Sequence, residues 1–346
     1  MKKIRIHLYF ICFLFYTFKS LELDVNVNKK RVLVIGIDGL FKRCMNQANT
    51  TTFEYLKNTG SWTENGRTVI EALSSAGWTS ILCGLDSEVS GVFDNSWIAP
   101  WMFGGKAKIS TATGNKPFPC LFSEIKKNNP NMIVKVSWAW EWFLNLGNIS
   151  MPGSIDKEYF CYPYPDRDIN ASAKCDAQMV ENTLESIKND FDFMYTFFGS
   201  VDEAGHIFKF CSKEYIERIS EINSYLFRII AELKNQNIFN NTYVIVTTDH
   251  GASFMQNWHG NQDDDNLIIP FYFLGPGIKK GYELEDLVRT TDVAPTVAHL
   301  LGIDEKKMNK LWRGRIIKEA FINYSDELNK ENPDEIIKLL QQNLRK

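Results

Sequence analysis

The chain has 346 residues, of which 44% are hydrophobic and 23% are charged. This is enough for a sizeable core, and the length suggests one large domain or two ordinary ones. With 39 basic and 42 acidic residues the formal net charge is -3. There is no basic excess that would predict binding to a nucleic-acid polymer or to a membrane surface.

The first twenty residues predict a secretory signal peptide. Three basic residues lie within the first five positions, and an apolar run from Leu8 to Phe18 follows. A basic start and an apolar segment of about ten residues are typical of such leaders. The run is shorter than the roughly 20 apolar residues of a spanning helix. We expect residues 1–20 to be removed and residues 21–346 to be the mature protein. An uncleaved anchor is the alternative, because Phe18 is bulky for a cleavage site.

Two further features agree with secretion. Asn-X-Ser/Thr sequons begin at Asn49, Asn148, Asn170, Asn240 and Asn323. An even set of cysteines remains outside the leader, compatible with disulfides in an oxidising compartment: Cys44, Cys83, Cys120, Cys161, Cys175 and Cys211. We take Cys161–Cys175 as the first pairing, while Cys44 and Cys83 could instead be buried small hydrophobes. The expectation is a secreted, disulfide-bonded glycoprotein.

Short apolar strands alternate with helical stretches along the chain. This predicts an α/β fold with a central, mainly parallel sheet and helices on both faces. In chain order, strands are expected at 31–37, 132–138, 191–198, 243–248 and 267–274. Helices are expected at 52–57, 77–82, 121–127, 176–189, 213–234 and 291–301. Because no repeat or convincing linker is present, we expect one large domain with loop insertions.

Ionisable residues gather where the predicted strands end. Asp38 follows the first strand, and Asp202 and His206 follow the strand at 191–198. Asp249, His250 and His259 follow the strand at 243–248. Sites in parallel sheets form outside the carboxyl ends of the strands, so all six side chains could converge on one edge. We expect the three histidines to lie in loops, and His299, inside a predicted helix, to be structural.

Three aspartates and three histidines make two sets of three Asp/His ligands. This is what two zinc ions need, with open positions left for a substrate. Taken singly, each of these residues is more often a surface or hydrogen-bonded residue than a ligand. The prediction of a metal site therefore depends on the whole set.

Four segments resemble the metal motifs of the alkaline phosphatase superfamily and occur in the same order. They are Val34-Ile35-Gly36-Ile37-Asp38-Gly39, Asp202-Glu203-Ala204-Gly205-His206, Thr248-Asp249-His250-Gly251 and His259-Gly260. Later pieces, such as Thr291-Asp292-Val293-Ala294-Pro295-Thr296, match as well, so the resemblance runs from about Val32 to Arg315. The chain looks most like the type I phosphodiesterase/nucleotide pyrophosphatase branch.

The resemblance implies two zinc ions, although other divalent metals are not excluded by the ligand types. One zinc would be held by Asp202, His206 and His259. The other would be held by Asp38, Asp249 and His250, together with the nucleophile.

The nucleophile is expected about ten residues before the glycine of Cys83-Gly84-Leu85, which gives Ser74. Ser75 and Thr79 are the alternatives, and a helix-capping role is the structural interpretation of Ser74. Asn95 resembles the asparagine that donates to a non-bridging phosphate oxygen; otherwise it is an ordinary turn residue.

These resemblances imply a hydrolase of phosphodiester or pyrophosphate bonds that passes through a phosphoseryl intermediate on Ser74. The segment Ser74-Ser75-Ala76-Gly77-Trp78 lacks the Cys/Ser-x-Pro-x-Arg context of sulfatases. No arginine between Arg67 and Arg167 is available to clamp a monoester, although Lys106, Lys108 or a distant residue could take this role. A phosphomonoesterase or phosphonate hydrolase is the alternative, and an inactive extracellular binding glycoprotein is less favoured.

The expected substrate is a small-molecule phosphate ester, either a nucleotide or a phospholipid head group. Four aromatic residues follow the nucleophile and could stack a base or surround a choline cation: Trp78, Trp97, Trp101 and Phe103. The alternative for each of them is a structural role, in which the ring covers the edge of the sheet. The sequence predicts no membrane span beyond the leader and leaves the oligomeric state open.

Overall fold

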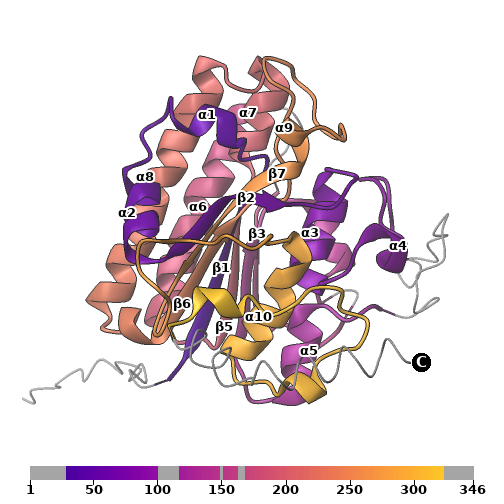
Figure 1. Ribbon diagram of the computed structural model, residues 1–346, viewed down its shortest axis with the longest axis vertical. Coiled ribbons are helices and arrows are strands. Elements are labelled where there is room, and N and C mark those ends of the chain that lie inside the picture. Colours follow the sequence, from indigo (N-terminus) through magenta and orange to yellow (C-terminus); the bar gives the residue numbers. More distant parts are fainter. Residues whose placement is uncertain (1–28, 100–116, 149–150, 163–167, 323–346) are drawn as a thin grey trace, which may run out of the picture.

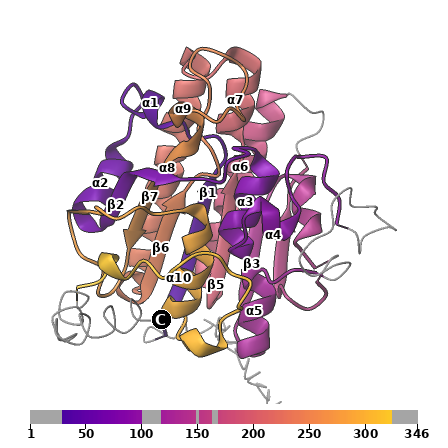
Figure 2. The same cartoon turned by 45° about the vertical axis from the view of Figure 1, so that its right-hand side comes forward.

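A computed structural model describes residues 29–99, 117–148, 151–162 and 168–322. At its centre is an eight-stranded sheet ordered β4-β3-β5-β1-β6-β7-β2-β8, and helices pack on both of its faces (Figures 1 and 2). The predicted leader, Trp101, Phe103 and the sequon at Asn323 lie outside the described residues.

Parallel pairing dominates the sheet. β1 pairs in parallel with β5 and β6, while β7 is antiparallel to both β6 and β2. The predicted α/β fold with a mainly parallel sheet is therefore confirmed. The strands are β1 (Arg31–Ile37), β2 (Ser61–Arg67), β3 (Val134–Trp138), β4 (Lys157–Phe160), β5 (Phe193–Phe198), β6 (Thr242–Thr247), β7 (Ile268–Leu274) and β8 (Tyr282–Glu283).

The helices form two layers. On one face of the sheet are α2 (Thr51–Thr59), α6 (Ile169–Lys188), α7 (Ser200–Phe208) and α8 (Lys213–Asn235). On the other are α3 (Ser74–Cys83), α5 (Leu121–Asn128) and α10 (Val293–Leu300). The remaining α-helices are α1 (Lys42–Met45), α4 (Ser87–Ser90) and α9 (Asp264–Leu267), and short 3-10 turns lie at 141–145, 239–241, 290–292, 305–307 and 318–320.

β1 is buried along its whole length between these two layers. Val32 and Val34 belong to the apolar core shared with α3 and α10. Leu33, Ile35 and Ile37 belong to the core on the side of α6 and α8. A parallel strand covered on both faces needs a continuous apolar sequence, which explains why β1 was visible in the sequence.

Several elements differ from the sequence-based expectations. α3 begins at Ser74 rather than at residue 77, because small residues let its first turn pack closely on the strand ends. The α6 helix begins at Ile169, where Asp168 accepts hydrogen bonds from two backbone N–H groups of the first turn. β2 (Ser61–Arg67) was missed because its sequence is polar, with only alternate residues buried.

Three disulfides link the described cysteines. Cys161–Cys175 confirms the predicted pairing. The other two bonds are Cys44–Cys211 and Cys83–Cys120. The alternative that Cys44 and Cys83 are only buried hydrophobes is therefore wrong.

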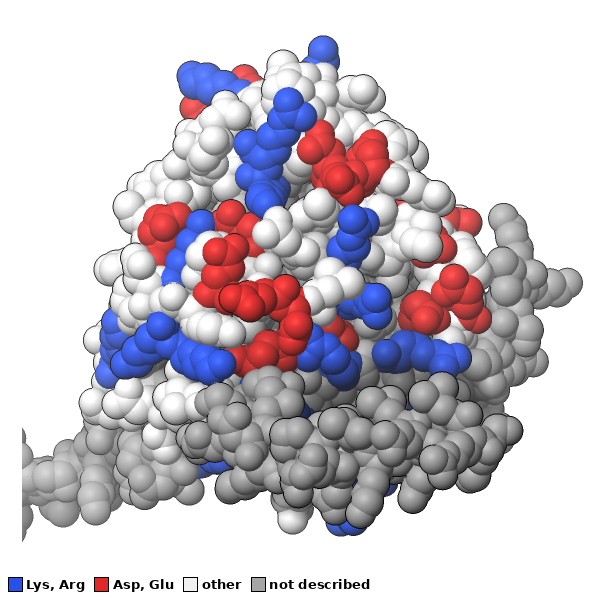
Figure 3. All heavy atoms as spheres, in the orientation of Figure 1, with Lys and Arg blue, Asp and Glu red and all other residues white. Residues whose placement is uncertain are grey.

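Neither sign of charge dominates among the described residues on the face of the molecule seen in Figure 3. Basic and acidic side chains lie interspersed on the face shown in Figure 3, in keeping with the small net charge of the chain. Within the described residues, no helix combines the length and apolar character that crossing a bilayer requires.

A buried ion pair at the amino end of β1 generates a prediction about stability. Arg31 is fully buried, and its Nη2 lies 2.6 Å from Oδ1 of Asp190. Because Asp190→Ala leaves a buried guanidinium without this partner, we expect the free energy of unfolding to fall by about 3 kcal/mol. Urea denaturation measures this change, and Asp190→Asn should lose less. Equal stability of Asp190→Ala and wild type would contradict the prediction.

Candidate metal centre and nucleophile

Three adjacent strand ends build the site. Asp38 follows β1, α7 follows β5, and Asp249 and His250 follow β6. Since β1 lies between β5 and β6, their carboxyl ends meet at one edge. His259 lies between β6 and β7, and because β7 is antiparallel to β6 this connection stays at the same edge.

The first group of ligands, here called site A, consists of Asp202, His206 and His259. Nε2 of His206 lies 3.1 Å from Oδ2 of Asp202 and 3.2 Å from Nε2 of His259. The expectation that His206 lies in a loop is wrong, because it is on α7 (Ser200–Phe208). Its spacing of four residues from Asp202 places both side chains on one face of the helix.

The second group, site B, consists of Asp38, Asp249 and His250, all of them buried. Nε2 of His250 lies 3.2 Å from Oδ2 of Asp249 and 3.5 Å from Oδ1 of Asp38. The rings of His250 and His259 stack with their centroids 3.7 Å apart, so sites A and B adjoin.

The second ring nitrogen of each histidine fixes how the ring is oriented. Nδ1 of His206, His250 and His259 lies 2.8–3.0 Å from a backbone carbonyl oxygen. Nδ1–H must donate to the carbonyl, so each neutral ring presents the lone pair of Nε2 to the site. This is the arrangement that histidine ligands of metals adopt.

The carboxylates of both sites also fit cations. One oxygen each of Asp38, Asp202 and Asp249 is buried without a hydrogen-bond partner. Buried carboxylate oxygens and imidazole lone pairs that face one another need a cation between them. Mixed Asp/His sets of three ligands suit zinc, and the structure therefore satisfies the chemical requirement of the predicted two-metal centre.

In the metal-free protein, burial and neighbouring charges shift the pKa values of several of these residues. Burial and then the charges of Asp249 and Asp202 raise the pKa of Asp38. Burial, followed by the charge of Asp202, raises the pKa of Asp249 to about 7. Burial lowers the pKa of His259 to about 4. Without cations, burial therefore favours the neutral forms of Asp38, Asp249 and His259. Asp202 is the exception, because the charges of the neighbouring histidines lower its pKa.

Ser74 lies beside site B at the first position of α3. Its Oγ lies 3.1 Å from Nε2 of His250, and Leu73 before it is the N-cap, so the Ser74 hydroxyl does not cap the helix. The alternatives Ser75 and Thr79 are fully buried, and the Thr79 hydroxyl donates to the backbone oxygen of Ser75. Of these three hydroxyls, only that of Ser74 reaches the candidate metal ligands.

Asn95 lies next to Ser74 at the rim of the site. Its Oδ1 accepts a hydrogen bond of 3.0 Å from the backbone N–H of Ser75. This bond fixes the orientation of the amide and leaves its NH₂ group as a donor. The arrangement is compatible with the predicted contact to a phosphate oxygen.

A cavity of about 270 Å³ opens in front of these residues. It is lined by Asp38, Ser74, Asn95, Asp202 and His206 from the candidate centre, and further out by Ala139, Trp140, Glu141, Tyr162, Ser172, Asp176, Phe197, Gly199 and Glu203. The described lining therefore combines carboxylates with three aromatic residues, Trp140, Tyr162 and Phe197. Tyr162 had no distinguishing signal in the sequence.

The two described aromatic residues expected to contact substrate have other roles. Trp78 is fully buried, and its Nε1 donates to Oδ2 of Asp38 over 3.2 Å. Trp97 is also buried, and its ring packs against Phe118 and Trp142. The prediction that Trp78 and Trp97 contact substrate is therefore wrong; Trp78 instead orients a candidate metal ligand.

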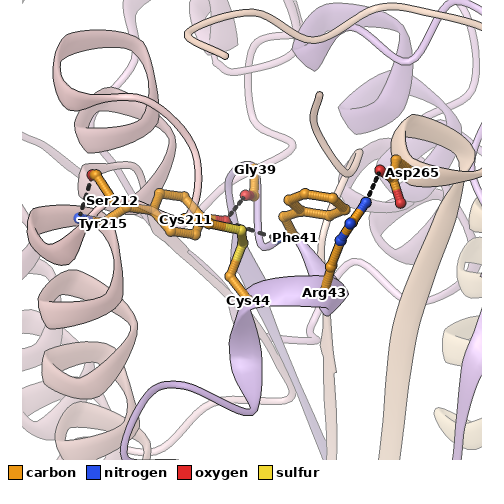
Figure 4. Close-up of a disulfide and its surroundings, with 8 residues drawn as sticks. All are labelled: Gly39, Phe41, Arg43, Cys44, Cys211, Ser212, Tyr215 and Asp265. Carbon is orange, nitrogen blue, oxygen red and sulfur yellow. Dashed lines mark hydrogen bonds and ion pairs between the residues drawn. A yellow bond between two sulfur atoms is a disulfide. The ribbon is translucent and has the colours of Figure 1, made fainter. Parts of the chain in front are cut away.

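A disulfide and a tyrosine connect the strand ends that carry the two sites (Figure 4). Cys44–Cys211 joins α1, beyond Asp38, to the segment that follows α7. Nearby, the Tyr215 hydroxyl accepts from the backbone N–H of Phe41 and donates to the backbone oxygen of Gly39. Sequence reasoning missed these supports because nothing local relates residues so far apart in the chain.

Gly39 allows the loop after β1 to approach site A. Its φ is +61°, and a Cβ atom at this position would lie 2.5 Å from Oδ1 of Asp202. Such a contact is far too short, so any other residue here would displace the Asp202 carboxylate or the loop itself.

Comparison with known proteins assigns the family. The model of the family "Type I phosphodiesterase / nucleotide pyrophosphatase" matches residues 32–271, which include sites A and B and Ser74. The chain therefore belongs to this family, a member of the alkaline phosphatase superfamily, as the sequence motifs predicted.

Solved structures share the fold. Murine ectonucleotide pyrophosphatase/phosphodiesterase 5 aligns with a TM-score of 0.62 and 16% identity, over 80% of this chain and 96% of that chain. A 2-O GAG sulfatase also gives a TM-score of 0.62 and 16% identity, over 85% of this chain and 74% of that chain. Both confirm the alkaline-phosphatase-like fold.

Curated relatives match over a shorter region. Arylsulfatase K of Danio rerio is 29% identical over 94 residues, which are 26% of this chain and 18% of that protein. Arylsulfatase K of Canis lupus familiaris is 30% identical over 104 residues, 27% of this chain and 19% of that protein. The chain thus matches less than a fifth of the length of either relative.

Removing one carboxylate of site B should stabilise the metal-free protein. The folded-state pKa of Asp249, about 7, lies above its ordinary value of 3.8. Folded protein then binds more protons than unfolded protein, so this group makes stability fall as pH rises from about 4 to 7. At pH 8 without metal, we expect the free energy of unfolding of Asp249→Asn to exceed that of wild type by roughly 2 kcal/mol.

Zinc should reverse this order, because wild type gains stability from the metal and Asp249→Asn loses most of that gain. Thermal unfolding at pH 5 and pH 8, with zinc and with a chelator, measures both effects. An Asp249→Asn variant that is less stable than wild type in the chelator at pH 8 would contradict the account of the charges.

Gly39→Ala tests the close approach of the two sites. Because the new Cβ must displace Asp202, we expect zinc to stabilise this variant much less than wild type. Gly153→Ala is the matched control, since Gly153 also has a positive φ but nothing lies within 4 Å of its added Cβ. Thermal unfolding with and without zinc separates the variants; an equal zinc response in both would refute the argument.

Proposed function

We propose that the protein hydrolyses phosphodiester or pyrophosphate bonds of small molecules, with Ser74 as nucleophile and two zinc ions as cofactors. The observation that carries this proposal is the position of Ser74, whose Oγ lies 3.1 Å from Nε2 of His250 in site B. Ser74 also lines the same cavity as Asp38, Asp202 and His206. Membership of the type I phosphodiesterase family supports the same reaction.

Asp202, His206 and His259 would hold one ion, and Asp38, Asp249 and His250 the other. Zinc bound there would supply Lewis acidity and positive charge for the phosphoryl group. The protein residues set where this charge lies, because backbone carbonyls fix the three imidazole rings and Trp78 fixes Asp38.

Ser74 is oriented for attack by the local backbone and by His250. As the first residue of α3 it is held by helix geometry, and its Oγ lies 3.1 Å from Nε2 of His250. That nitrogen would bind the zinc of site B, so the ion would lie within reach of the Ser74 oxygen. The remaining lone pairs of Oγ are then free for a phosphorus atom bound in the cavity. Asn95 donates its amide to a non-bridging oxygen, where negative charge is retained during transfer.

The reaction proceeds in two displacements. Attack by Ser74 Oγ forms an O–P bond and breaks the bond between phosphorus and the leaving oxygen. The proton lost by the Ser74 hydroxyl balances the one taken up by the leaving oxygen, which departs as an alcohol or phosphate. Water then attacks the phosphoserine, breaks the Ser74 O–P bond and releases a phosphomonoester. The second step restores the Ser74 hydroxyl, so the protein is unchanged after each turnover.

The charge of the cavity favours a diester over a monoester. Glu141, Asp176 and Glu203 line it in addition to the candidate metal ligands, and the described lining contains no lysine or arginine. A monoester carries one more negative charge than a diester and meets more repulsion from these carboxylates. The cavity thus supports phosphodiesterase activity over phosphomonoesterase activity.

The sulfatase relatives suggest sulfate esters as a second candidate substrate class. Ser74 lies in the sequence Ser74-Ser75-Ala76-Gly77-Trp78, without the proline and arginine of the sulfatase motif. The serine hydroxyl therefore remains unmodified in the proposed mechanism, which suits transfer of a phosphoryl group.

The predicted leader at 1–20 completes the proposal. We propose that it directs the chain to the secretory pathway and that residues 21–346 form the secreted enzyme. The three disulfides support an oxidising compartment. Asn49, Asn170 and Asn240, at three of the sequons, are exposed and could accept glycans.

The test compares three chromogenic substrates on zinc-loaded protein: bis-p-nitrophenyl phosphate, p-nitrophenyl phosphate and p-nitrophenyl sulfate. We expect the phosphodiester to give the highest kcat/KM. Ser74→Ala should lower this value at least ~1000-fold, and Asn95→Ala roughly 100-fold, the effect of one oxyanion donor. Ser75→Ala is the matched control, because the Ser75 side chain is buried away from site B.

Each other outcome overturns a defined part of the proposal. Preference for p-nitrophenyl phosphate indicates a phosphomonoesterase, and preference for the sulfate indicates a sulfatase. Full activity of Ser74→Ala excludes Ser74 as nucleophile. Bound zinc without turnover of any of the three substrates contradicts the hydrolase proposal and favours the inactive binding glycoprotein.

A further inference from the structure

We propose that Asp176, on α6, is a positioning residue for site A and sets the zinc affinity of that site. The inference rests on the proposed two-metal centre. Asp176 contributes no atom to either ligand group, and no sequence motif marks it. Its role follows from the contacts that its carboxylate makes with the start of α7.

Both oxygens of the Asp176 carboxylate hold the amino end of α7. Oδ1 accepts from the backbone N–H of Gly199 over 2.9 Å, and Oδ2 accepts from that of Ser200 over 3.0 Å. The N-cap residue Gly199 has no side chain to provide such a cap. The first N–H groups of a helix need acceptors from outside it, and here a different helix supplies them.

The helix that Asp176 holds is the one that carries site A. Asp202 and His206 lie in the first two turns of α7 (Ser200–Phe208). A helix transmits a shift of its first residues to side chains one turn further on, because hydrogen bonds fix its internal geometry. Asp176 therefore controls how far Asp202 and His206 project into the cavity, whose lining includes all three side chains.

α6 is a firm support for this contact. Cys175, the residue before Asp176, forms the disulfide with Cys161 beyond β4. Asp176 itself is 1% exposed, so its carboxylate has little room to move. A rigid acceptor gives the α7 backbone one preferred position, which is what ligands on a short helix require.

Site B depends on the same junction less directly. The backbone N–H of Asp38 donates to the oxygen of Phe198, the last residue of β5, over 2.8 Å. Phe198 is already fixed by the pairing of β5 with β1, which does not involve Asp176. Loss of the Asp176 contacts should consequently weaken site A much more than site B.

A general structural role is the competing explanation, and the chain offers a matched control for it. Asp292 is also buried, and its two carboxylate oxygens accept from the backbone N–H groups of Arg289 and Arg315, each over 2.8 Å. It does not contact α7 and does not line the cavity. Asp292→Asn thus removes the same kind of contact without affecting a ligand helix.

The first experiment removes metal from the protein with a chelator and then titrates the metal-free protein with zinc, which gives the stoichiometry and the affinity of zinc binding. Wild type should bind two zinc ions. Asp176→Asn cannot accept from both N–H groups, so we expect its second zinc to bind about 10- to 100-fold more weakly, the usual effect of losing a group that orients ligands. Asp292→Asn should lose thermal stability in the chelator to a similar degree and still bind both ions as wild type does.

A second experiment assigns the effect to one site. In the Asp249→Asn background only site A remains intact, and adding Asp176→Asn should weaken the remaining zinc by the same factor. In the His206→Asn background only site B remains, and Asp176→Asn should change its affinity less than threefold. Asp176→Glu keeps the negative charge but displaces it, so we expect an intermediate loss of zinc affinity. This variant replaces Asp176→Asn in the experiment if Asp176→Asn does not fold.

The outcomes separate the two proposals. If wild type binds no zinc, the proposed two-metal function fails before Asp176 is tested. If wild type binds two ions, and both Asp176 variants bind them as tightly as Asp292→Asn does, Asp176 is only a helix cap and the inference is wrong. Equal weakening of sites A and B would also overturn it.

Discussion

The structure depends on the approach of three aspartates beyond the ends of β1, β5 and β6: Asp38 and Asp249 are buried, and Asp202 is largely buried. Like charges so close together repel one another, and burial removes the water that would otherwise screen them. Burial and neighbouring charges raise the pKa values of Asp38 and Asp249, while the histidines keep the pKa of Asp202 low. The fold maintains this unfavourable arrangement, which two cations would relieve.

Several distant parts of the chain keep these side chains in place. Trp78 donates to Asp38 from the core, and Asp176 holds the start of α7. The bond between Cys44 and Cys211 ties the loop beyond site B to the segment beyond site A. Two residues in that segment, Lys209 and Cys211, have positive φ values, a conformation that surrounding contacts must enforce. Residues that are not themselves candidate ligands thus keep the metal-binding side chains in position.

The sequence was informative where one physical requirement determined the residue types. Buried parallel strands need apolar runs, so β1, β5 and β6 were predictable, and with them the convergence of six metal-type residues. It was uninformative where partners lie far apart, as for Trp78 with Asp38 or Tyr215 with Gly39. It misled at His206, because the small and polar residues around it suggested a loop although helical spacing brings it beside Asp202. β2 (Ser61–Arg67) was missed since its pairing with β7, not its own composition, makes it a strand.

The position of β1 in the sheet also affects how the chain can be made. β1 is the first strand in sequence, yet its register partners begin at Phe193 in β5 and Thr242 in β6. At about 5–20 residues per second, roughly ten to thirty seconds of synthesis separate it from its first partner. During this time the apolar segment Arg31–Ile37 has no sheet to join, and such exposed strands favour aggregation. We therefore expect the yield of folded protein to fall when translation is slowed or when nascent chains are not shielded.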